Sequence, residues 1–296
     1  MDILILVLII LGAVIMVGNI AMYGVFIYRM NDVISSGRKK DTFLIFLGFI
    51  LLIFFLVGYI VVSFWSKRDL MVAFILFFGA IFVTVMLLLC STLISTAKDR
   101  SMQIAQVLID VVDARDPNLH GHSRHVKNLT MMFYKYLPTA MKININQVSL
   151  EYASLMHDIG KLGIPESILN KPAKLTDEEW EIMKTHPKVG VKLLKQIKTF
   201  DSISDWILYH HERPDGKGYY KKNPVLVPLA AKMISVCDTY SAITMKRSYK
   251  SSRTHEEAMQ IIKEVAGTQL DKTLVDIFVT IPKEEFEKCI PDKLEN

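Results

Sequence analysis

Histidine and aspartate side chains recur in order along the second half of this sequence, often in adjacent pairs. Imidazole nitrogens and carboxylate oxygens are the ligands that divalent transition metals take from proteins. Two adjacent imidazoles, as at His210 and His211, would be costly to bury without such partners. The ordered set therefore predicts a metal cluster whose ligands are His122, His157, Asp158, His186, His210, His211 and Asp238.

His157 and Asp158 are neighbours near the end of an apolar helical segment that Gly160 and Gly163 interrupt. Adjacent helical residues diverge by about 100 degrees, so the pair binds one metal at the helix edge, or two metals with Asp158 as the bridge. A two-metal site suits phosphoester hydrolysis, because the ions activate water and stabilise an in-line displacement. Lys161 lies on the helix face of His157, where its ammonium group can bind a phosphate oxygen or assist the leaving group.

The remaining histidines have plainer interpretations. His255 lies in the surface-like run SSRTHEEAM and is interpreted as structural or solvated. His120 and His125 flank the proposed ligand His122, and for both we favour a structural role.

Charge and cysteine content restrict the class of protein. The formal net charge of +5 is modest, so a solvated basic surface is favoured over binding of a nucleic acid polymer. The cysteines form no CxxC pair and indicate a reducing compartment without a disulfide framework. They are Cys90, Cys237 and Cys289.

Helical patterns surround the proposed ligands. The segments SLEYASLMHDIGKLG and TDEEWEIMKTHPKVGVKLLKQI carry apolar residues at helical intervals. Thr176 followed by Glu179 is a capping-box signal, which predicts that a helix begins just after Thr176.

The N-terminal third of the sequence is far more apolar than the rest. Three charge-free apolar stretches are long enough to cross a bilayer: Ile3 to Tyr28, Phe43 to Phe64, and Leu70 to Ile94. The loop after the first stretch is rich in Lys and Arg, which predicts that this loop and everything after the third stretch are cytoplasmic. The absence of ionisable residues inside the stretches favours an anchor or sensor over a channel or transporter. The bilayer is thus an expected partner, and the chain is expected to be a multi-pass protein of the cell membrane.

Residues 96–113 connect the membrane part to the rest of the chain and carry an amphipathic helical pattern. Its apolar stripe either pairs in a homodimer or packs on the domain that follows. The stripe consists of Ile94, Met102, Ala105, Leu108, Ile109 and Val112. We expect a membrane domain at 1–95, this connecting helix, a catalytic domain at 108–280, and a C-terminal tail at 281–296.

Four long blocks of the sequence resemble the HD superfamily of metal-dependent phosphohydrolases, specifically its HD-GYP branch. They are DARDPNLHGHSRHV, MHDIGKLGIPESILNKPAKLTDEEWEIMKTHPKVG, HHERPDGKGYY and VPLAAKMISVCDTYSAITMKRSYK. The resemblance covers roughly Leu108 to Val279 and implies an all-α bundle with bound iron, manganese or similar ions. It also implies hydrolysis of the messenger cyclic di-GMP to pGpG and, in some members, onward to GMP.

The resemblance also implies a role for each residue. One ion would be bound by His122, His157, Asp158 and Asp238, and the other by His186, His210 and His211, with Asp158 as the bridge. Lys161 matches the motif lysine near the scissile phosphate. Tyr219, Arg247 and Lys250 match positions that contact the dinucleotide, as suits an aromatic ring and two cations.

This sequence departs from the family pattern at four places. Tyr220 replaces the proline of the GYP motif, which is expected to loosen that loop. Asn118 stands where members with three metals carry a glutamate, so we expect two ions, Fe or Mn. His125 replaces a common arginine, and the segment KKNPVLVPL is shorter than usual.

These observations favour a cyclic di-GMP phosphodiesterase tethered to the inner face of the membrane. A second hypothesis keeps the mechanism but takes another cyclic nucleotide as substrate. A third is a receptor that binds the dinucleotide without turnover, and a purely structural scaffold ranks last because it leaves the metal cluster without a purpose.

Overall fold

The protein is all helical, as expected, in a computed structural model that describes residues 2–34, 39–65, 70–115, 121–245 and 252–291. The described residues contain no strand, and an isolated bridge joins Ala266 to Leu270. The chain divides into two compact units, Met1–Ser101 and Met102–Asn296.

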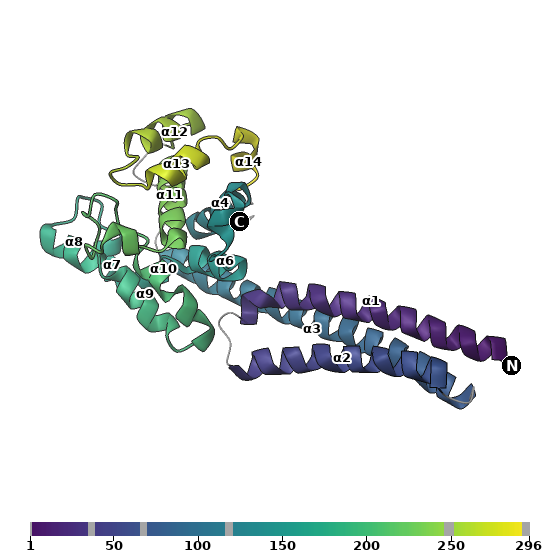
Figure 1. Cartoon of the computed structure of the whole chain (residues 1–296). Helices are drawn as coiled ribbons and strands as arrows, with labels where there is room; N and C mark the ends of the chain where they lie inside the picture. Colours follow the sequence, from purple (N-terminus) through teal and green to yellow (C-terminus); the bar gives the residue numbers. More distant parts are fainter. Residues whose placement is uncertain (1, 35–38, 66–69, 116–120, 246–251, 292–296) are drawn as a thin grey trace. The chain divides into compact units, whose positions relative to one another are not determined.

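Figure 1 draws the helices, and the short 3-10 helices that it leaves unlabelled are called η here. They are α1 (Asp2–Ile34), α2 (Lys39–Trp65), α3 (Leu70–Arg115), α4 (His122–Tyr136), α5 (Thr139–Lys142), α6 (Gln147–Met156), η1 (Ile159–Gly163), α7 (Glu166–Leu169), α8 (Asp177–Met183), α9 (His186–Leu194), η2 (Lys198–Ile203), α10 (Ser204–Leu208), η3 (Pro224–Leu226), α11 (Leu229–Thr244), α12 (His255–Glu264), α13 (Lys272–Phe278) and α14 (Lys283–Glu287).

The N-terminal unit is built from α1, α2 and the first part of α3. Among the described residues these are three helices long and apolar enough to cross a membrane, which confirms the three apolar helices predicted from the sequence. Apolar residues of all three pack together, and Asn19 adds polar links. Its side-chain amide donates to the carbonyl of Ala80 over 3.1 Å and accepts from the Thr84 hydroxyl over 2.9 Å.

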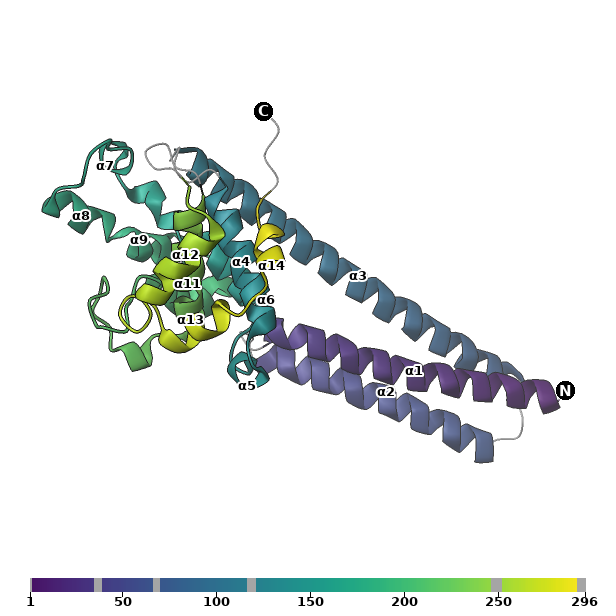
Figure 2. The ribbon, with the colours of Figure 1, turned by 90° about the horizontal axis from the view of Figure 1, so that it is seen from above.

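The second unit has one apolar core, and the helices α4, α6 and α11 all contribute residues to it. Phe133 of α4, Leu150 of α6 and Ile234 of α11 are all fully buried in it. Figure 2 shows α4 and α11 close together in the middle of this unit, with α7 and α8 at one end. Residues of α4, α6 and α11 therefore share a core that fixes the elements bearing the ligands.

Local signals in the sequence explain where the helices near the site begin. The capping box of Thr176 and Glu179 is present, so α8 starts at Asp177 as predicted. The pattern that follows is not one helix, because α8 ends at Met183 and α9 starts at His186 with Pro187 in its first turn. A proline is well tolerated there, because its missing N–H would have no partner in the helix.

The end of α3, from Met102 onward, belongs to the second unit. Ala105, Ile109 and Val112 are buried in its core. Leu108 does not share their face, contrary to the predicted stripe, and it is 52% exposed. The end of the chain also differs from the expected tail at 281–296, because Phe286 and other residues of this stretch are buried in the same core.

Candidate metal centre and substrate cleft

The proposed ligands come from five separated segments. Gly121, with a left-handed φ of 73°, precedes α4 and lets the chain turn so that His122 opens the helix. His157 and Asp158 lie between α6 and η1, and His186 is the first residue of α9. The remaining ligands are His210 and His211, which follow α10, and Asp238 in α11.

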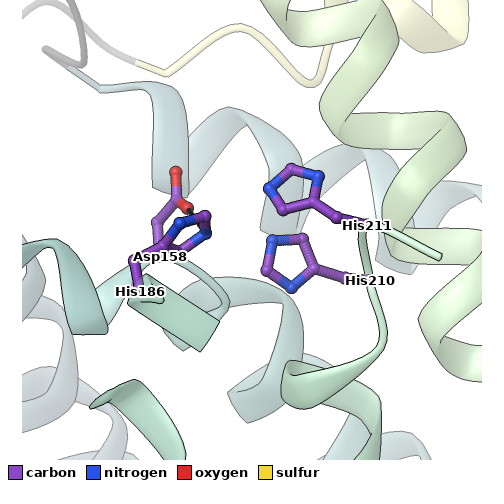
Figure 3. A group of neighbouring side chains, drawn as sticks. All are labelled: Asp158, His186, His210 and His211. Carbon is purple, nitrogen blue, oxygen red and sulfur yellow. Dashed lines mark ion pairs between the residues drawn. The ribbon is translucent and has the colours of Figure 1, made fainter. Parts of the chain in front are cut away.

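The structure brings these segments together. Potential ligand atoms of two groups lie within 4.8 Å of one another: Asp158, His186, His210 and His211 in one, and His122, His157 and Asp158 in the other. Asp238 adjoins the second group, with its Oδ1 atom 3.1 Å from Nε2 of His122. Figure 3 shows the His186 and Asp158 side chains facing those of His210 and His211.

Three of the imidazoles are oriented in the same way. Nδ1 of His157 lies 2.9 Å from the carbonyl oxygen of Ser154. Nδ1 of His186 lies 2.9 Å from that of Met183, and Nδ1 of His210 lies 2.6 Å from that of Ile207. A carbonyl only accepts hydrogen bonds, so each Nδ1 carries a proton, and each Nε2 is the nitrogen left to bind a metal.

The three Nε2 atoms are buried and have no hydrogen-bond partner in the part of the chain that the structure describes. Buried polar nitrogens without partners are rare, and each costs free energy. Imidazoles that donate from one nitrogen to a carbonyl and present the other are typical metal ligands. These residues therefore fit a divalent metal.

Asp158 lies between the two groups. Its Oδ1 atom is 3.2 Å from Nε2 of His186, and its Oδ2 atom is 3.4 Å from Nε2 of His157. Oδ2 is also 2.6 Å from Nζ of Lys161. One carboxylate oxygen thus faces each group of histidines, as a bridging ligand requires.

The charges of the site are strongly perturbed. Burial lowers the pKa of His122 and His210, and it lowers that of His211 to about 3, so these rings are neutral. Burial also disfavours the charged form of His157, but the adjacent Asp158 carboxylate outweighs it and raises the pKa of His157 to about 9. A metal ion at this Nε2 must therefore displace a proton from His157.

The carboxylates stay ionised although they are buried. Burial alone would raise the pKa of Asp158, but Lys161 and His157 hold it well below its usual range. For Asp238, the hydrogen bond and charge of His122 overcome burial and lower the pKa.

A cleft of about 600 Å³ opens over the metal ligands, and Lys161, Trp180 and Tyr219 contribute to its wall. A hollow of about 450 Å³ adjoins it and shares Trp180, Tyr219 and His211 with it. The Tyr219 ring lies 4.4 Å from that of His211 between centroids, so Tyr219 packs on a proposed ligand. The expected substrate contacts Arg247 and Lys250 lie outside the described residues.

The loop that carries Tyr219 is held by a buried carboxylate. Glu212 accepts from the backbone N–H of Tyr220 over 2.6 Å and from that of Lys222 over 3.0 Å. The Tyr220 hydroxyl also donates to the carbonyl of Lys184 over 2.9 Å. Tyr220 thus ties the loop down through an N–H that a proline would lack, which is a contact that the sequence did not predict.

Glycines beside the site are required by close packing. A Cβ atom on Gly160 would overlap the carbonyl of His186 and lie 2.5 Å from the nitrogen of Gly190. Gly160 therefore allows η1, which follows Asp158, to pack against the first turn of α9, which carries His186. The sequence suggested only that this glycine interrupts a helix.

Sequence reasoning missed Ser241 of α11. Its hydroxyl lies 2.9 Å from Nδ1 of His122 and 3.0 Å from Nδ1 of His125, and all three side chains are buried. A serine in an apolar helical pattern gives no signal that would single it out. His255 bonds through Nδ1 to the Tyr240 hydroxyl over 2.8 Å, in agreement with a structural role. His120 and Asn118 lie outside the described residues.

Comparison with known proteins agrees with this geometry. The family described as "HD domain" matches residues 106–274, over half of the chain. A protein named "Cyclic di-GMP phosphodiesterase" from Vibrio cholerae is 32% identical over 184 residues, which are 58% of this chain and 37% of that protein. Another of that name, from Thermotoga maritima, is 31% identical over 193 residues, or 63% of this chain and 51% of that protein.

A third relative, "3'3'-cGAMP-specific phosphodiesterase 1" of Vibrio cholerae, is 31% identical over 194 residues, or 64% of this chain and 44% of that protein. The chain thus spans about half the length, or less, of these curated relatives. HD phosphohydrolases depend on metal, and the histidine and aspartate cluster offers the ligands for it. By its sequence match and its motifs, the chain belongs to the HD-domain family, in the HD-GYP branch.

Proposed function

We propose that this protein is a membrane-anchored, metal-dependent phosphodiesterase that hydrolyses cyclic di-GMP, with pGpG or GMP as the end product. The observation that carries the proposal is the set of buried Nε2 atoms without a hydrogen bond that gather around the Asp158 carboxylate, beside a cleft that Asp158 and His186 line. The relatives named as cyclic dinucleotide phosphodiesterases supply the substrate class.

Two divalent ions, Fe or Mn, fit the donor set of imidazoles and carboxylates. One would be bound by His122, His157, Asp158 and Asp238. The other would be bound by His186, His210, His211 and Asp158. When bound, such a pair supplies an activated water and positive charge for an in-line displacement at phosphorus.

The protein's own residues position the substrate. Asp158 would contribute a ligand to both ion sites, because its two oxygens face different groups of histidines. Lys161 contacts Asp158 and lines the cleft, so its ammonium is placed to bind an oxygen of the scissile phosphate. Arg247 and Lys250 are proposed as further phosphate contacts on sequence grounds alone.

The shape of the cleft suits a molecule with two bases. The cleft and the adjoining hollow share Trp180 and Tyr219 at their boundary. The Trp180 side chain is 45% exposed, so its indole face is open to stack on a base. We infer that one base lies on each side of this boundary, with the scissile phosphate over the metals.

A second candidate substrate is 3'3'-cGAMP, because a relative named as specific for it matches as well as those named for cyclic di-GMP. The two molecules differ in one purine base. Their discrimination therefore depends on hydrogen bonds to a base edge, and the metal cluster does not contribute to it.

Membrane association follows from the three long apolar helices, and a cytoplasmic catalytic domain is our proposal from the basic first loop. The basic residues of that loop are Arg29, Arg38, Lys39 and Lys40; Arg38 lies outside the described residues, and the others lie at the ends of α1 and α2. A homodimer through the connecting helix would use the large apolar side chains that residues 96–113 leave exposed, which are Ile104, Val107, Leu108 and Val111.

The proposal is tested with the full chain in detergent micelles, loaded anaerobically with Fe(II) or Mn(II). Cyclic di-GMP, 3'3'-cGAMP and a linear dinucleotide are incubated with wild type and with Asp158→Asn, and the products are separated by chromatography. Asp158→Asn keeps the shape of the bridging side chain but removes its charge.

Formation of pGpG or GMP by wild type, and not by the variant, supports the phosphodiesterase. Faster cleavage of 3'3'-cGAMP would move the assignment to that substrate. Tight binding of cyclic di-GMP that remains intact in the metal-loaded protein would refute hydrolysis and favour the receptor hypothesis.

A further inference from the structure

The first turn of α4 has no capping side chain of its own. The residue before the helix is Gly121, which makes no side-chain hydrogen bond to the helix. The first backbone hydrogen bond runs from the N–H of His125 to the carbonyl of Gly121 over 2.9 Å, so the N–H groups of residues 122–124 find no partner within the helix. A side-chain oxygen of Asp, Asn, Ser or Thr normally fills this need. The helix that opens with His122 therefore requires an acceptor from another part of the chain.

The end of α3 supplies an acceptor. Oδ1 of Asp113 accepts from the Ser123 hydroxyl over 2.9 Å, and both side chains are buried. Burial raises the pKa of Asp113, and hydrogen bonds from the hydroxyl and the backbone N–H of Ser123 act against this rise. A carboxyl group that accepts from an N–H of the first turn does what a capping residue does. Asp113 thus caps α4 from a different helix.

A second contact holds the same turn of α4. Arg124 donates through Nε to Oδ1 of Asp110 over 2.9 Å, and its Nη2 atom contacts Oδ2. Such a bidentate pair fixes the orientation of the two side chains as well as their separation. Asp110 and Asp113 are three residues apart and therefore lie on one face of α3. Two successive residues of α4 are thus held by the same face of α3.

The residue directly before these two is His122, a proposed metal ligand. Its Nε2 atom lies 3.1 Å from Oδ1 of Asp238, and it offers a ligand atom to the group that contains His157 and Asp158. Groups of this kind function only when they are held within about 0.5 Å of the productive geometry. The helix that holds the turn, α3, also carries the third apolar stretch.

We propose that Asp113 is a positioning residue for His122, assisted by Asp110, and that α3 thereby sets the affinity of one of the two metal sites. The inference rests on the proposed metal centre, in which His122 contributes to only one of the two ion sites. Loss of the cap should therefore weaken the site at His122 and leave the other nearly unchanged. A merely structural role would lower stability and affect both sites alike.

The test is a calorimetric titration of the metal-stripped full chain in detergent with Mn(II). Asp113→Ala removes the acceptor, whereas Asp113→Asn keeps an oxygen that can accept from Ser123. Ser123→Ala deletes only the hydroxyl that donates to Asp113. Asp271→Ala is the matched control, because Asp271 caps α13 by accepting from the N–H of Leu274 over 3.2 Å. Thermal unfolding without metal reports the stability of each variant.

We expect Asp113→Ala to weaken one Mn(II) site by a factor of about 10 to 100 and to leave the other nearly unchanged. Asp113→Asn should restore most of the affinity. Ser123→Ala should weaken the same site, and Asp110→Ala should do so by a smaller factor, because its pair with Arg124 is partly exposed to solvent. Asp271→Ala should lower the melting temperature without changing the affinity of either site.

Unchanged Mn(II) binding in Asp113→Ala, or equal weakening of both sites, would overturn the proposal. If Asp113→Ala does not fold, unchanged binding in Ser123→Ala overturns it instead. If wild type binds two Mn(II) ions and cleaves cyclic di-GMP while these variants bind as wild type does, only this inference fails. If Asp113→Ala weakens one site but wild type cleaves no cyclic dinucleotide, this inference stands and the proposed function fails.

Discussion

Replacement of Ser241 by alanine is expected to weaken metal binding by a factor of about 10 to 100. The Ser241 hydroxyl orients His122 at 2.9 Å and also contacts His125 at 3.0 Å, in a site closed to solvent. Without it, Nδ1 of each ring loses its partner. A buried polar group without a hydrogen-bond partner costs about 1–3 kcal/mol, and about 1.4 kcal/mol corresponds to a tenfold change in affinity.

The assay is a calorimetric titration of the metal-stripped full chain with Mn(II). Thermal unfolding in the same detergent separates loss of affinity from loss of fold. Thr244→Ala is the matched control in the same helix, because the Thr244 hydroxyl donates to the backbone carbonyl of Tyr240 over 2.9 Å. We expect Thr244→Ala to bind Mn(II) as wild type does.

An unchanged Mn(II) affinity in Ser241→Ala, with the protein folded, would refute the reasoning. It would mean that His122 is held by its helix and by packing, or that it does not bind the metal.

Three further changes are predicted. Gly160→Ala should lower the free energy of unfolding by about 3 kcal/mol or more, because the added Cβ meets backbone atoms. In Gly163→Ala the added Cβ meets only a Val189 methyl group, so thermal unfolding should show a smaller loss of stability. Glu212→Gln should weaken cyclic dinucleotide binding, measured by calorimetry, because an amide nitrogen cannot accept from a backbone N–H. Asp113→Asn should change the pH dependence of stability. The pKa of Asp113 is about 7 in the folded protein and 3.8 in the unfolded chain, so the wild type loses stability as the pH rises from 3.8 to about 7. The melting temperature of the variant relative to wild type should therefore be higher at pH 8 than at pH 4, and an equal difference at both would contradict this.

The apolar helices and the identity of the candidate ligands could be predicted because both depend on local sequence. An apolar, charge-free run of more than about 20 residues favours an apolar environment, whatever the rest of the sequence contains. Histidine pairs such as His210 and His211 are conspicuous because two adjacent imidazoles are rarely buried without a purpose. The start of α8 was likewise predictable, since a capping box forms within four residues.

Other features could not be predicted because they join residues far apart in the sequence. Ser241 contacts His122 and His125 only because α11 packs beside α4. The end of α3 shows the same limit. Periodicity placed both Leu108 and Ile109 on the apolar stripe, but in the folded protein Ile109 is buried and Leu108 is exposed.

The sequence by itself determined which side chains are available for metal chemistry and which segments are apolar enough for a bilayer, since residue type and spacing decide both. Only the tertiary structure decided how the imidazoles are oriented, because each Nδ1 partner depends on the local backbone or on a neighbouring helix. It also decided that Glu212 anchors the loop of Tyr219, and that Ser241 joins His122 to His125. These features arise from close packing, in which a group far along the chain supplies or denies the hydrogen bond that each polar atom requires.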